Sequence, residues 1–261
     1  MTQSSPTTDN GQAPAAIILA AGLGKRMGSD LPKVLHEVGD RPMVAIVVDA
    51  CRAAGCGRII VVVGQGGRLV RLALAGSGVE FAEQPEQHGT GHAVQCAEAQ
   101  LRSGPVPKDV FVLCGDGPLI RASTLRALRE LHERSGADAT LATAIVDDPT
   151  GYGRIVRDGT GRFSAIVEHK AASPEQKAIR EVNPSYYLFR TQKLLETLPQ
   201  VQRSAAGEYY LTDVPGLILA GGGVVELIEA VPPEDTLSIN TPDELAKVDA
   251  IYRRRAAEGV A

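Results

Sequence analysis

Strand-like and helix-like patterns alternate along the first half of the chain, and this alternation limits the folds that it can adopt. Apolar runs of strand length cover residues 17–21, 58–63, 79–82, 110–113 and 139–146. Helical apolar spacing covers residues 43–54, 68–75, 90–102 and 123–135, with Ser123 placed as the cap of the last helix. Because buried strands separated by helices pair in parallel, the pattern predicts an α/β fold: a Rossmann-like, mixed and mainly parallel sheet flanked by helices.

The pattern changes after about residue 150. Short strand-like pieces cover residues 154–156, 163–167, 181–189 and 224–231, and helical stretches cover residues 192–198, 212–220 and 243–255. No internal repeat is visible, and in particular no hexapeptide period of the left-handed β-helix type. We therefore expect one α/β domain over residues 15–255 and no β-helix domain.

Composition and charge exclude several classes of partner. The net charge of −4 over 261 residues gives no electrostatic footprint for nucleic acid, and no apolar run reaches membrane-spanning length. Residues 1–14 are polar, contain proline and lack the basic start and apolar core of a secretory signal, so they are predicted to be a flexible tail. The four cysteines form no C-x-x-C pair; buried free thiols and a cytoplasmic location are expected, and a Cys51–Cys56 metal half-site lacks partners.

The first apolar run breaks into a glycine-rich loop. Gly22 and Gly24 are followed by Arg26, and the loop ends at Lys33 after a proline. Glycines let backbone N–H groups approach phosphate oxygens, and the two cations add charge that suits a polyphosphate. The loop lacks the spacing of a P-loop and the third glycine of the dinucleotide fingerprint. The alternative is a surface loop that happens to be rich in glycine and lysine.

A second group of polar residues follows the run at 79–82. Gln84 and Gln87 carry amide groups that suit recognition of a base edge, and Thr90 lies between two glycines at a predicted helix start. His88 and His92 lie four residues apart and could share a metal on one helix face. No third ligand accompanies them, and the glycines argue against a regular helix there, so zinc is the weaker interpretation.

A lone aspartate follows the apolar run at 110–113. Asp116 lies in the sequence G-D-G-P-L, at the carboxyl end of that predicted strand. One or two carboxylates plus phosphate oxygens are the usual ligands of Mg²⁺ in such sites. The alternative is a turn aspartate that caps its own backbone. Since ligands of parallel sheets bind beyond the carboxyl ends of the strands, the phosphate loop upstream favours the metal.

The wording of these segments resembles one enzyme family. The order L-A-A-G-x-G-x-R-M and then S-D-L-P-K-V-L resembles the signature loop of the sugar-1-phosphate nucleotidylyltransferases, and Q-x-G-T-G-H-A and G-D-x-P-L resemble its base-recognition and metal-binding motifs. Four later segments are similar to the N-acetylglucosamine-1-phosphate uridylyltransferases of that family: G-Y-G-R, V-E-H-K, E-V-N and G-E-Y-Y-L-T-D-V. The resemblance covers residues 15–255.

The resemblance implies a site and a division of the chain. It implies a nucleotide-binding part over about 15–146, a sugar-binding part over about 147–240 and a closing helix over 241–255. The residues that it implies are, for catalysis, Arg26 and Lys33; for nucleotide binding, Leu19, Ala20, Ala21, Gly22, Gly24, Gln84, Gly89 and Thr90; for sugar binding, Gly153, Glu168 and Asn183; and for a Mg²⁺ ion, Asp116 and Asn240. Independently, the residues after Asn240 read as a helix start, with Thr241 as N-cap and Pro242 in the first turn.

The implied reaction is uridylyl transfer from UTP to N-acetylglucosamine 1-phosphate. Two residues depart from the family pattern. Lys25 stands where Thr is frequent and should add charge to the loop, and Pro184-Ser185 follows Asn183 where Thr-Gly or Ser-Gly is usual, which leaves the choice of sugar open. The alternatives are the same chemistry on another sugar 1-phosphate or nucleotide, a cytidylyltransferase that shares the opening loop, and a non-catalytic nucleotide-sugar-binding regulator. The expected partners are UTP and a sugar 1-phosphate; a homo-oligomer and a separate acetyltransferase are left open.

Overall fold

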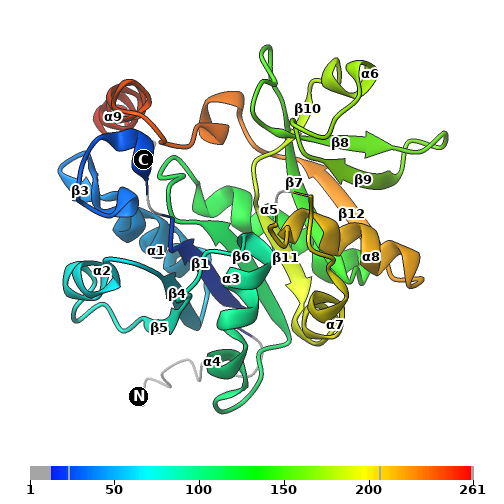
Figure 1. The fold of residues 1–261 in the computed structure, drawn as a ribbon, viewed down its shortest axis with the longest axis horizontal. Coiled ribbons are helices and arrows are strands. Elements are labelled where there is room, and N and C mark those ends of the chain that lie inside the picture. Colours follow the sequence, from blue (N-terminus) through cyan, green and yellow to red (C-terminus); the bar gives the residue numbers. More distant parts are fainter. Residues whose placement is uncertain (1–12, 23, 206, 260–261) are drawn as a thin grey trace, which may run out of the picture.

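A computed structural model describes residues 13–22, 24–205 and 207–259 of the protein (Figure 1). The tail predicted for residues 1–14 lies outside these residues except for its last two. Among the described residues, no helix combines the length and the apolar composition that crossing a bilayer requires.

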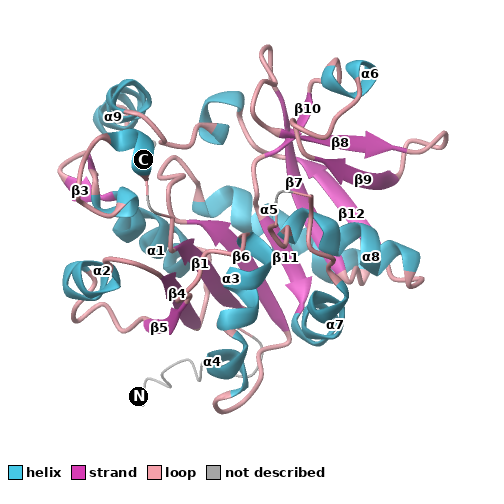
Figure 2. Cartoon of the chain, in the orientation of Figure 1, coloured by secondary structure: helices cyan, strands magenta, loops and turns pink. Residues whose placement is uncertain are grey.

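A ten-stranded mixed sheet runs through the molecule, as the sequence predicts (Figure 2). Its strand order is β5-β4-β1-β6-β11-β7-β10-β8-β9, and β12 pairs with β7 outside this path. Its strands are β1 (Ala15–Ala20), β4 (Arg58–Val63), β5 (Glu80–Glu83), β6 (Asp109–Cys114), β7 (Ala139–Ile145), β8 (Gly153–Arg157), β9 (Phe163–Val167), β10 (Glu181–Asn183), β11 (Tyr187–Arg190) and β12 (Val225–Glu229). A separate ribbon pairs β2 (Glu37–Val38) with β3 (Arg41–Pro42).

Strands β1, β4, β5 and β6 are parallel, because each is an apolar run that returns through a helix or a long loop. Strand β11 is antiparallel and lies between β6 and β7, so the later part of the chain joins the same sheet as the earlier part. Strands β8, β9 and β10 extend the sheet at the end far from β5 (Figure 1).

Helices cover both faces of the sheet. They are α1 (Met43–Ala53), α2 (Gly67–Ala73), α3 (Thr90–Cys96), α4 (Glu98–Arg102), α5 (Ala122–Ser135), α6 (Pro174–Lys177), α7 (Thr191–Thr197), α8 (Val214–Ala220) and α9 (Pro242–Ala257). Alternation along β1 produces two cores: Ala16, Ile18 and Ala20 pack with α1, α2 and α5, and Ala15 and Ile17 pack with α3, α4, α7 and α8. Each fully buried isoleucine contributes roughly 2–3 kcal/mol of transfer free energy.

Three local predictions are wrong in detail. Ser123 does not cap α5, because the helix starts at Ala122 and Ser123 already lies within its first turn. The capping position belongs to Arg121, whose guanidinium is bound to Asp235 instead. The helix predicted over 90–102 breaks into α3 and α4 at Ala97, whose N–H bonds the carbonyl of Val94 at 3.0 Å in a tighter turn.

The strand predicted over 181–189 is also interrupted. Residues Pro184 and Ser185 separate β10 from β11, and Ser185 has a φ of +65°. Proline has no N–H to donate to a ladder, and a left-handed residue turns the chain out of the strand direction. This break lets β10 and β11 pair with different edges of β7 and leaves the two residues at the carboxyl end of β10.

Candidate active site

The carboxyl ends of the parallel strands bring three loops together. Leu19 of β1 lies beside Cys114 of β6, and the carbonyl of Leu19 accepts from Gly115 N at 2.9 Å. On the other side, the carbonyl of Val63 accepts from Gln84 N at 2.8 Å. The loops that follow β1, β5 and β6 therefore meet at one edge of the sheet, which is where ligands of such sheets bind.

A cavity of about 330 Å³ opens at this edge. Most of the residues predicted to bind nucleotide line it: Leu19, Ala21, Gly22, Gln84, Gly89 and Thr90. Two predicted residues do not line it, Ala20 and Gly24. The side chain of Ala20 is buried among the apolar residues of the core.

Gly24 serves the loop itself. Its φ is +60°, and a Cβ placed there would lie 2.7 Å from the Cβ of Lys33. Only glycine combines this conformation with so close an approach. Gly24 therefore lets the chain fold back on Lys33 and brings the lysine to the cavity, which Lys33 lines.

Two glutamine side chains stabilise one wall of this cavity. Gln84 is buried, and its Nε2 donates to the Gly89 carbonyl at 3.0 Å and lies 3.2 Å from His92 Nδ1. Gln87 Nε2 donates to the carbonyl of Ala21, which ties this wall to the end of β1. Both glutamines thus stabilise the pocket that they line, because their amide nitrogens form hydrogen bonds to backbone carbonyls.

The G-T-G segment is shaped by a neighbouring stretch of backbone. A Cβ on Gly89 would lie 2.5 Å from the carbonyl oxygen of Tyr209, and Gly91 N donates to that oxygen at 2.8 Å. The Thr90 hydroxyl accepts from Leu211 N at 3.0 Å. The two glycines are therefore needed for contact with residues 209–211 as well as for access to a ligand.

The histidines of this segment do not gather a metal site. His92 Nε2 lies 3.6 Å from Cys96 Sγ, and His88 Nε2 lies 2.6 Å from Glu86 Oε2. In residues 13–22, 24–205 and 207–259, no three His, Cys, Asp or Glu side chains are arranged to hold a metal ion. The structure thus offers no support for the zinc interpretation.

Lys33, Asp116 and Asn240 converge at the floor of the site. Lys33 Nζ donates to Asn240 Oδ1 at 2.9 Å and forms an ion pair with Asp116. The Lys33 and Asp116 side chains are 13% and 18% exposed, so the pair is partly shielded from water. One cationic nitrogen thus touches both side-chain oxygens that the resemblance assigns to a metal.

Asn240 is itself held in place. Glu244 Oε2 accepts from Asn240 N at 2.6 Å and from Thr241 N at 2.9 Å, within a capping box that opens α9. The predicted cap at Thr241 with Pro242 in the first turn is thereby confirmed. Ile239 N donates to the carbonyl of Asp116 at 3.1 Å and joins this segment to the end of β6.

The donor set fits magnesium. Mg²⁺ prefers oxygen ligands, keeps several waters and takes one or two protein side chains together with substrate phosphates. Asp116 and Asn240 supply one carboxylate and one amide oxygen on segments that are bonded to each other. The remaining ligands would come from water and from phosphate.

A second cavity of about 500 Å³ adjoins the first. The residues predicted to bind sugar, Gly153, Glu168 and Asn183, all line it. Arg26 lines this second cavity too, as does Asn240. The two cavities share Cys114 and Asp116, so a ligand in one would reach a ligand in the other beside the aspartate.

Burial has the largest effect on the pKa of Glu168. Burial raises the pKa of this carboxyl, and the Thr212 hydroxyl, which donates to Oε1 at 3.0 Å, acts in the opposite direction. Burial also raises the pKa of the Cys114 thiol to about 12, with the charge of Asp116 acting in the same direction. Cys114 is therefore a neutral thiol at physiological pH and not a nucleophile.

Several residues of the site were not among the predicted site residues. Ser185, noted only as part of a departure from the family, lines the second cavity, and Tyr210 and Glu208, noted only as part of a family-like segment, line the first. The hydroxyl of Tyr187 meets Asn183 Nδ2 at 2.6 Å. Tyr187 lies in an apolar strand, and nothing in its sequence context distinguishes it from a core residue.

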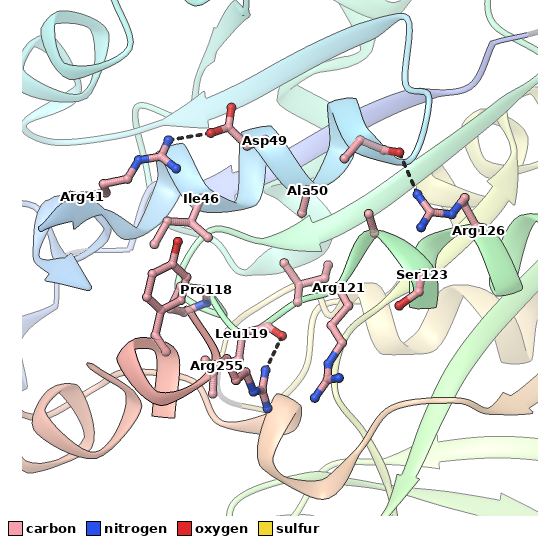
Figure 3. A pocket seen from close by; sticks show the side chains of 14 residues that line it. Arg41, Ile46, Asp49, Ala50, Pro118, Leu119, Arg121, Ser123, Arg126 and Arg255 are labelled. Carbon is pink, nitrogen blue, oxygen red and sulfur yellow. Dashed lines mark hydrogen bonds and ion pairs between the residues drawn. The ribbon is translucent and has the colours of Figure 1, made fainter. Parts of the chain in front are cut away.

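A further cavity of about 460 Å³ lies between α1, the start of α5 and α9 (Figure 3). None of the residues predicted to bind substrate or metal lines it. Its arginines are engaged. Arg41 pairs with Asp49 at 2.5 Å, and Arg126 and Arg255 donate to the carbonyls of Ala53 at 2.8 Å and Leu119 at 3.3 Å (Figure 3). Arg121 pairs with Asp235 at 2.6 Å. The candidate active site is therefore the pair of cavities at the strand ends.

Comparison with known proteins identifies the fold and the family. A family model described as the MobA-like NTP transferase domain matches residues 16–207. A crystal structure of apo-UDP-glucose pyrophosphorylase has the same fold, with a TM-score of 0.76 over 94% of this chain and 100% of that one at 16% sequence identity. Fold and family together define the class of protein, a nucleotidylyltransferase. The chain belongs to the MobA-like NTP transferase family.

Curated relatives are much closer in sequence. Proteins named "Bifunctional protein GlmU" are 47% identical in Exiguobacterium sp. over 93% of this chain, 46% identical in Heliobacterium modesticaldum over 92%, and 43% identical in Clostridium acetobutylicum over 93%. The match covers 53%, 52% and 53% of those relatives, respectively. The chain thus spans about half the length of the curated relatives it matches.

Proposed function

We propose that this protein transfers the uridylyl group of UTP to N-acetylglucosamine 1-phosphate, which yields UDP-N-acetylglucosamine and pyrophosphate. The observation that carries the proposal is the meeting of two cavities at Asp116, with Lys33 and Asn240 at the same point. A nucleotide and a second phosphorylated substrate need such a shared boundary, because their reacting phosphates must touch. Likeness to proteins named bifunctional GlmU supports the choice of substrates.

The nucleotide would occupy the smaller cavity. Its base would lie along Gln84 and the Gly89–Thr90 turn, and its phosphates would follow the loop after β1 toward Lys33. The sugar would occupy the larger cavity, against Gly153, Glu168 and Asn183, with its phosphate beside Asp116. This arrangement aims the sugar phosphate at the α-phosphorus of UTP.

Positioning and charge neutralisation would provide most of the catalysis. The sugar phosphate oxygen forms a bond to the α-phosphorus while the bond to pyrophosphate breaks. Lys33 would offset charge on the two reacting phosphates. Arg26 lines the sugar cavity, so it would have to reach across the shared boundary to hold the β- and γ-phosphates and favour their departure. Since the nucleophile is already an anion, no general base is required.

Asp116 and Asn240 would hold the divalent ion, which we propose to be magnesium. When bound, it would neutralise phosphate charge at the point where the two substrates meet. Lys33 now makes contact with both oxygens, so its ammonium group must move toward the phosphates as the ion enters. The four free cysteines support our further proposal of a reducing, cytoplasmic location.

The assay that tests the proposal is pyrophosphate release from UTP and a sugar 1-phosphate, with magnesium and with EDTA. A panel of sugar phosphates crossed with UTP, dTTP, CTP and GTP identifies the preferred pair. We expect the highest kcat/KM for UTP with N-acetylglucosamine 1-phosphate and loss of turnover in EDTA. Nucleotide binding without turnover on any sugar phosphate would favour a regulatory protein instead.

One observation favours a second candidate, the same chemistry on another sugar 1-phosphate. Ser185 lines the sugar cavity, where the family usually has glycine. A side chain there changes both the space and the hydrogen bonds that a sugar would meet. The same panel distinguishes the candidates, since a higher kcat/KM for another sugar phosphate would replace the first by the second.

A separate acetyltransferase partner and a homo-oligomer remain proposals for the whole assembly.

A further inference from the structure

Asn183 offers a defined face to the sugar cavity. It is 5% exposed, at the carboxyl end of β10, and Ser185 N donates to its side chain at 3.1 Å. Because a backbone N–H can only donate, the atom that it meets must be the amide oxygen. The amide nitrogen then points the other way and donates to Tyr187 Oη at 2.6 Å. The Ser185 N–H thus fixes the orientation of the amide, and the Tyr187 hydroxyl, which can accept as well as donate, is compatible with it.

The group that receives this nitrogen is fixed in turn. Tyr187 is 2% exposed, and burial raises the pKa of its hydroxyl, so the hydroxyl stays neutral. Its oxygen accepts from Asn183, and Tyr187, Ser185 and Cys114 line one small cavity.

Ser185 contacts Asn183 through an uncommon backbone conformation. Its φ is +65°, and it is one of two non-glycine residues with positive φ in the described part of the chain. Strain of this kind concentrates at functional sites, where the surrounding structure must hold it. Here the left-handed turn directs the Ser185 N–H to the side-chain oxygen of Asn183.

We propose that Tyr187 and Ser185 are positioning residues that lock the Asn183 amide, so that its second N–H faces the sugar cavity as a hydrogen-bond donor. The inference rests on the proposed function, since it names what that cavity selects. The preferred substrate is a sugar 1-phosphate with an acceptor oxygen opposite Asn183. Sugar phosphates that lack this acceptor leave a buried N–H without a partner and are rejected.

The shape of the cavity supports this assignment. Gly153 lies across from Asn183, and a Cβ there would come within 3.8 Å of Asn183 Nδ2. Its missing side chain keeps the amide open to the cavity that both residues line. A site with a buried donor discriminates strongly against ligands that cannot pair with it, whereas an apolar wall does not.

The test is Tyr187→Phe, which keeps the ring and removes the acceptor. The amide then keeps only its contact with Ser185 N, so it is held less firmly. We expect the KM for N-acetylglucosamine 1-phosphate to rise about tenfold with the KM for UTP unchanged, and preference over other sugar phosphates to fall. Calorimetric binding of UDP-N-acetylglucosamine should weaken by a similar factor, which gives a readout independent of turnover.

Two further variants separate positioning from folding. Thr140→Val removes a buried hydroxyl that lies 2.8 Å from His132 Nδ1 and lines neither cavity, so it should lower the melting temperature and leave the KM for the sugar phosphate unchanged. Ser185→Ala keeps the N–H that holds Asn183 and should raise that KM less than Tyr187→Phe does.

Failure of this inference can be told apart from failure of the proposed function. An unchanged sugar KM and an unchanged substrate preference in a folded Tyr187→Phe would overturn this inference alone. A wild-type protein that turns over no sugar phosphate would overturn the proposed function on which it rests.

Discussion

At the scale of single residues, Asp116 has the most exacting role in the proposed reaction. Its carboxylate lies where the two cavities meet and pairs with Lys33. We expect Asp116→Asn to lower kcat at least about a hundredfold, because the charge that would hold the metal is lost at the reacting phosphates. Pyrophosphate release measures the effect, and thermal unfolding should remain close to that of the wild type.

The matched control for this change is Asp147→Asn. Asp147 also pairs with a cation, Arg180, but it lies fully on the surface. Exposed pairs of this kind contribute little, so the control should keep normal turnover and stability. Turnover of Asp116→Asn near that of Asp147→Asn would contradict the role given to Asp116.

At the scale of elements, the loop after β1 tests whether Lys33 must be held close. Gly24 and Gly28 have φ values of +60° and +63°, so alanine is strained at either position. Alanine at 24 would also press on the Lys33 Cβ, whereas nothing lies within 4 Å of a Cβ at 28. We expect both variants to lose about 1 kcal/mol of unfolding free energy, but only Gly24→Ala to lose turnover. Equal kcat values for the two would show that the position of Lys33 does not limit the reaction.

The turn after β5 allows a similar comparison. Gly89 and Gly104 have φ values of +97° and +96°, but a Cβ on Gly89 would meet the Tyr209 backbone at 2.5 Å and a Cβ on Gly104 would meet nothing within 4 Å. Gly89→Ala must therefore push residues 209–211 away from the nucleotide cavity. We expect a weaker affinity for UTP, measured calorimetrically, and no change in Gly104→Ala. Normal UTP affinity in Gly89→Ala would remove the turn from the nucleotide site.

The helices and strands also show how much of the fold could be predicted from the sequence alone. The strand at 58–63 was predicted to the residue because its β-branched run stops at a glycine, and the cap at Thr241 followed from local chemistry. Contacts between distant segments left no such signal. The packing of Tyr209 on Gly89 depends on how distant segments are placed around the sheet, which no local pattern encodes. The bond from Asn183 to Tyr187 joins residues only four apart, but it depends on the left-handed turn at Ser185 between them. Ser185 was visible as a departure from the family, but its left-handed conformation was not.

At the scale of the whole molecule, one sheet unites the two halves of the site. Strand β11 lies between β6, which carries Asp116 at its end, and β7, which pairs with β10 and thereby places Asn183. The nucleotide and sugar cavities therefore share a rigid support and need not be brought together by domain closure. The boundary near residue 146 stays a prediction about function, since the strands on its two sides interleave.

The same sheet depends on a buried charged group for its stability in acid. Asp109 at the start of β6 lies 2.9 Å from Arg190 of β11 and 3.3 Å from His132 of α5. Burial raises the pKa of this carboxyl, but His132 and Arg190 together outweigh burial and hold the pKa below its ordinary value of 3.8. A carboxyl with a lowered folded-state pKa stabilises the protein above its unfolded pKa, and the contribution is lost as pH falls through the folded value.

We therefore expect the free energy of unfolding to fall as the pH drops below about 4, measured by urea unfolding across a pH series. Asp109→Asn should cost about 2 kcal/mol at pH 7, because it leaves the Arg190 and His132 side chains without their carboxylate. The variant should also lose part of the acid dependence, since it has no proton to take up at this position. Asp147→Asn, the exposed control used above, should leave stability at pH 7 nearly unchanged. A pH profile of Asp109→Asn parallel to that of the wild type would show that other carboxyls govern acid unfolding.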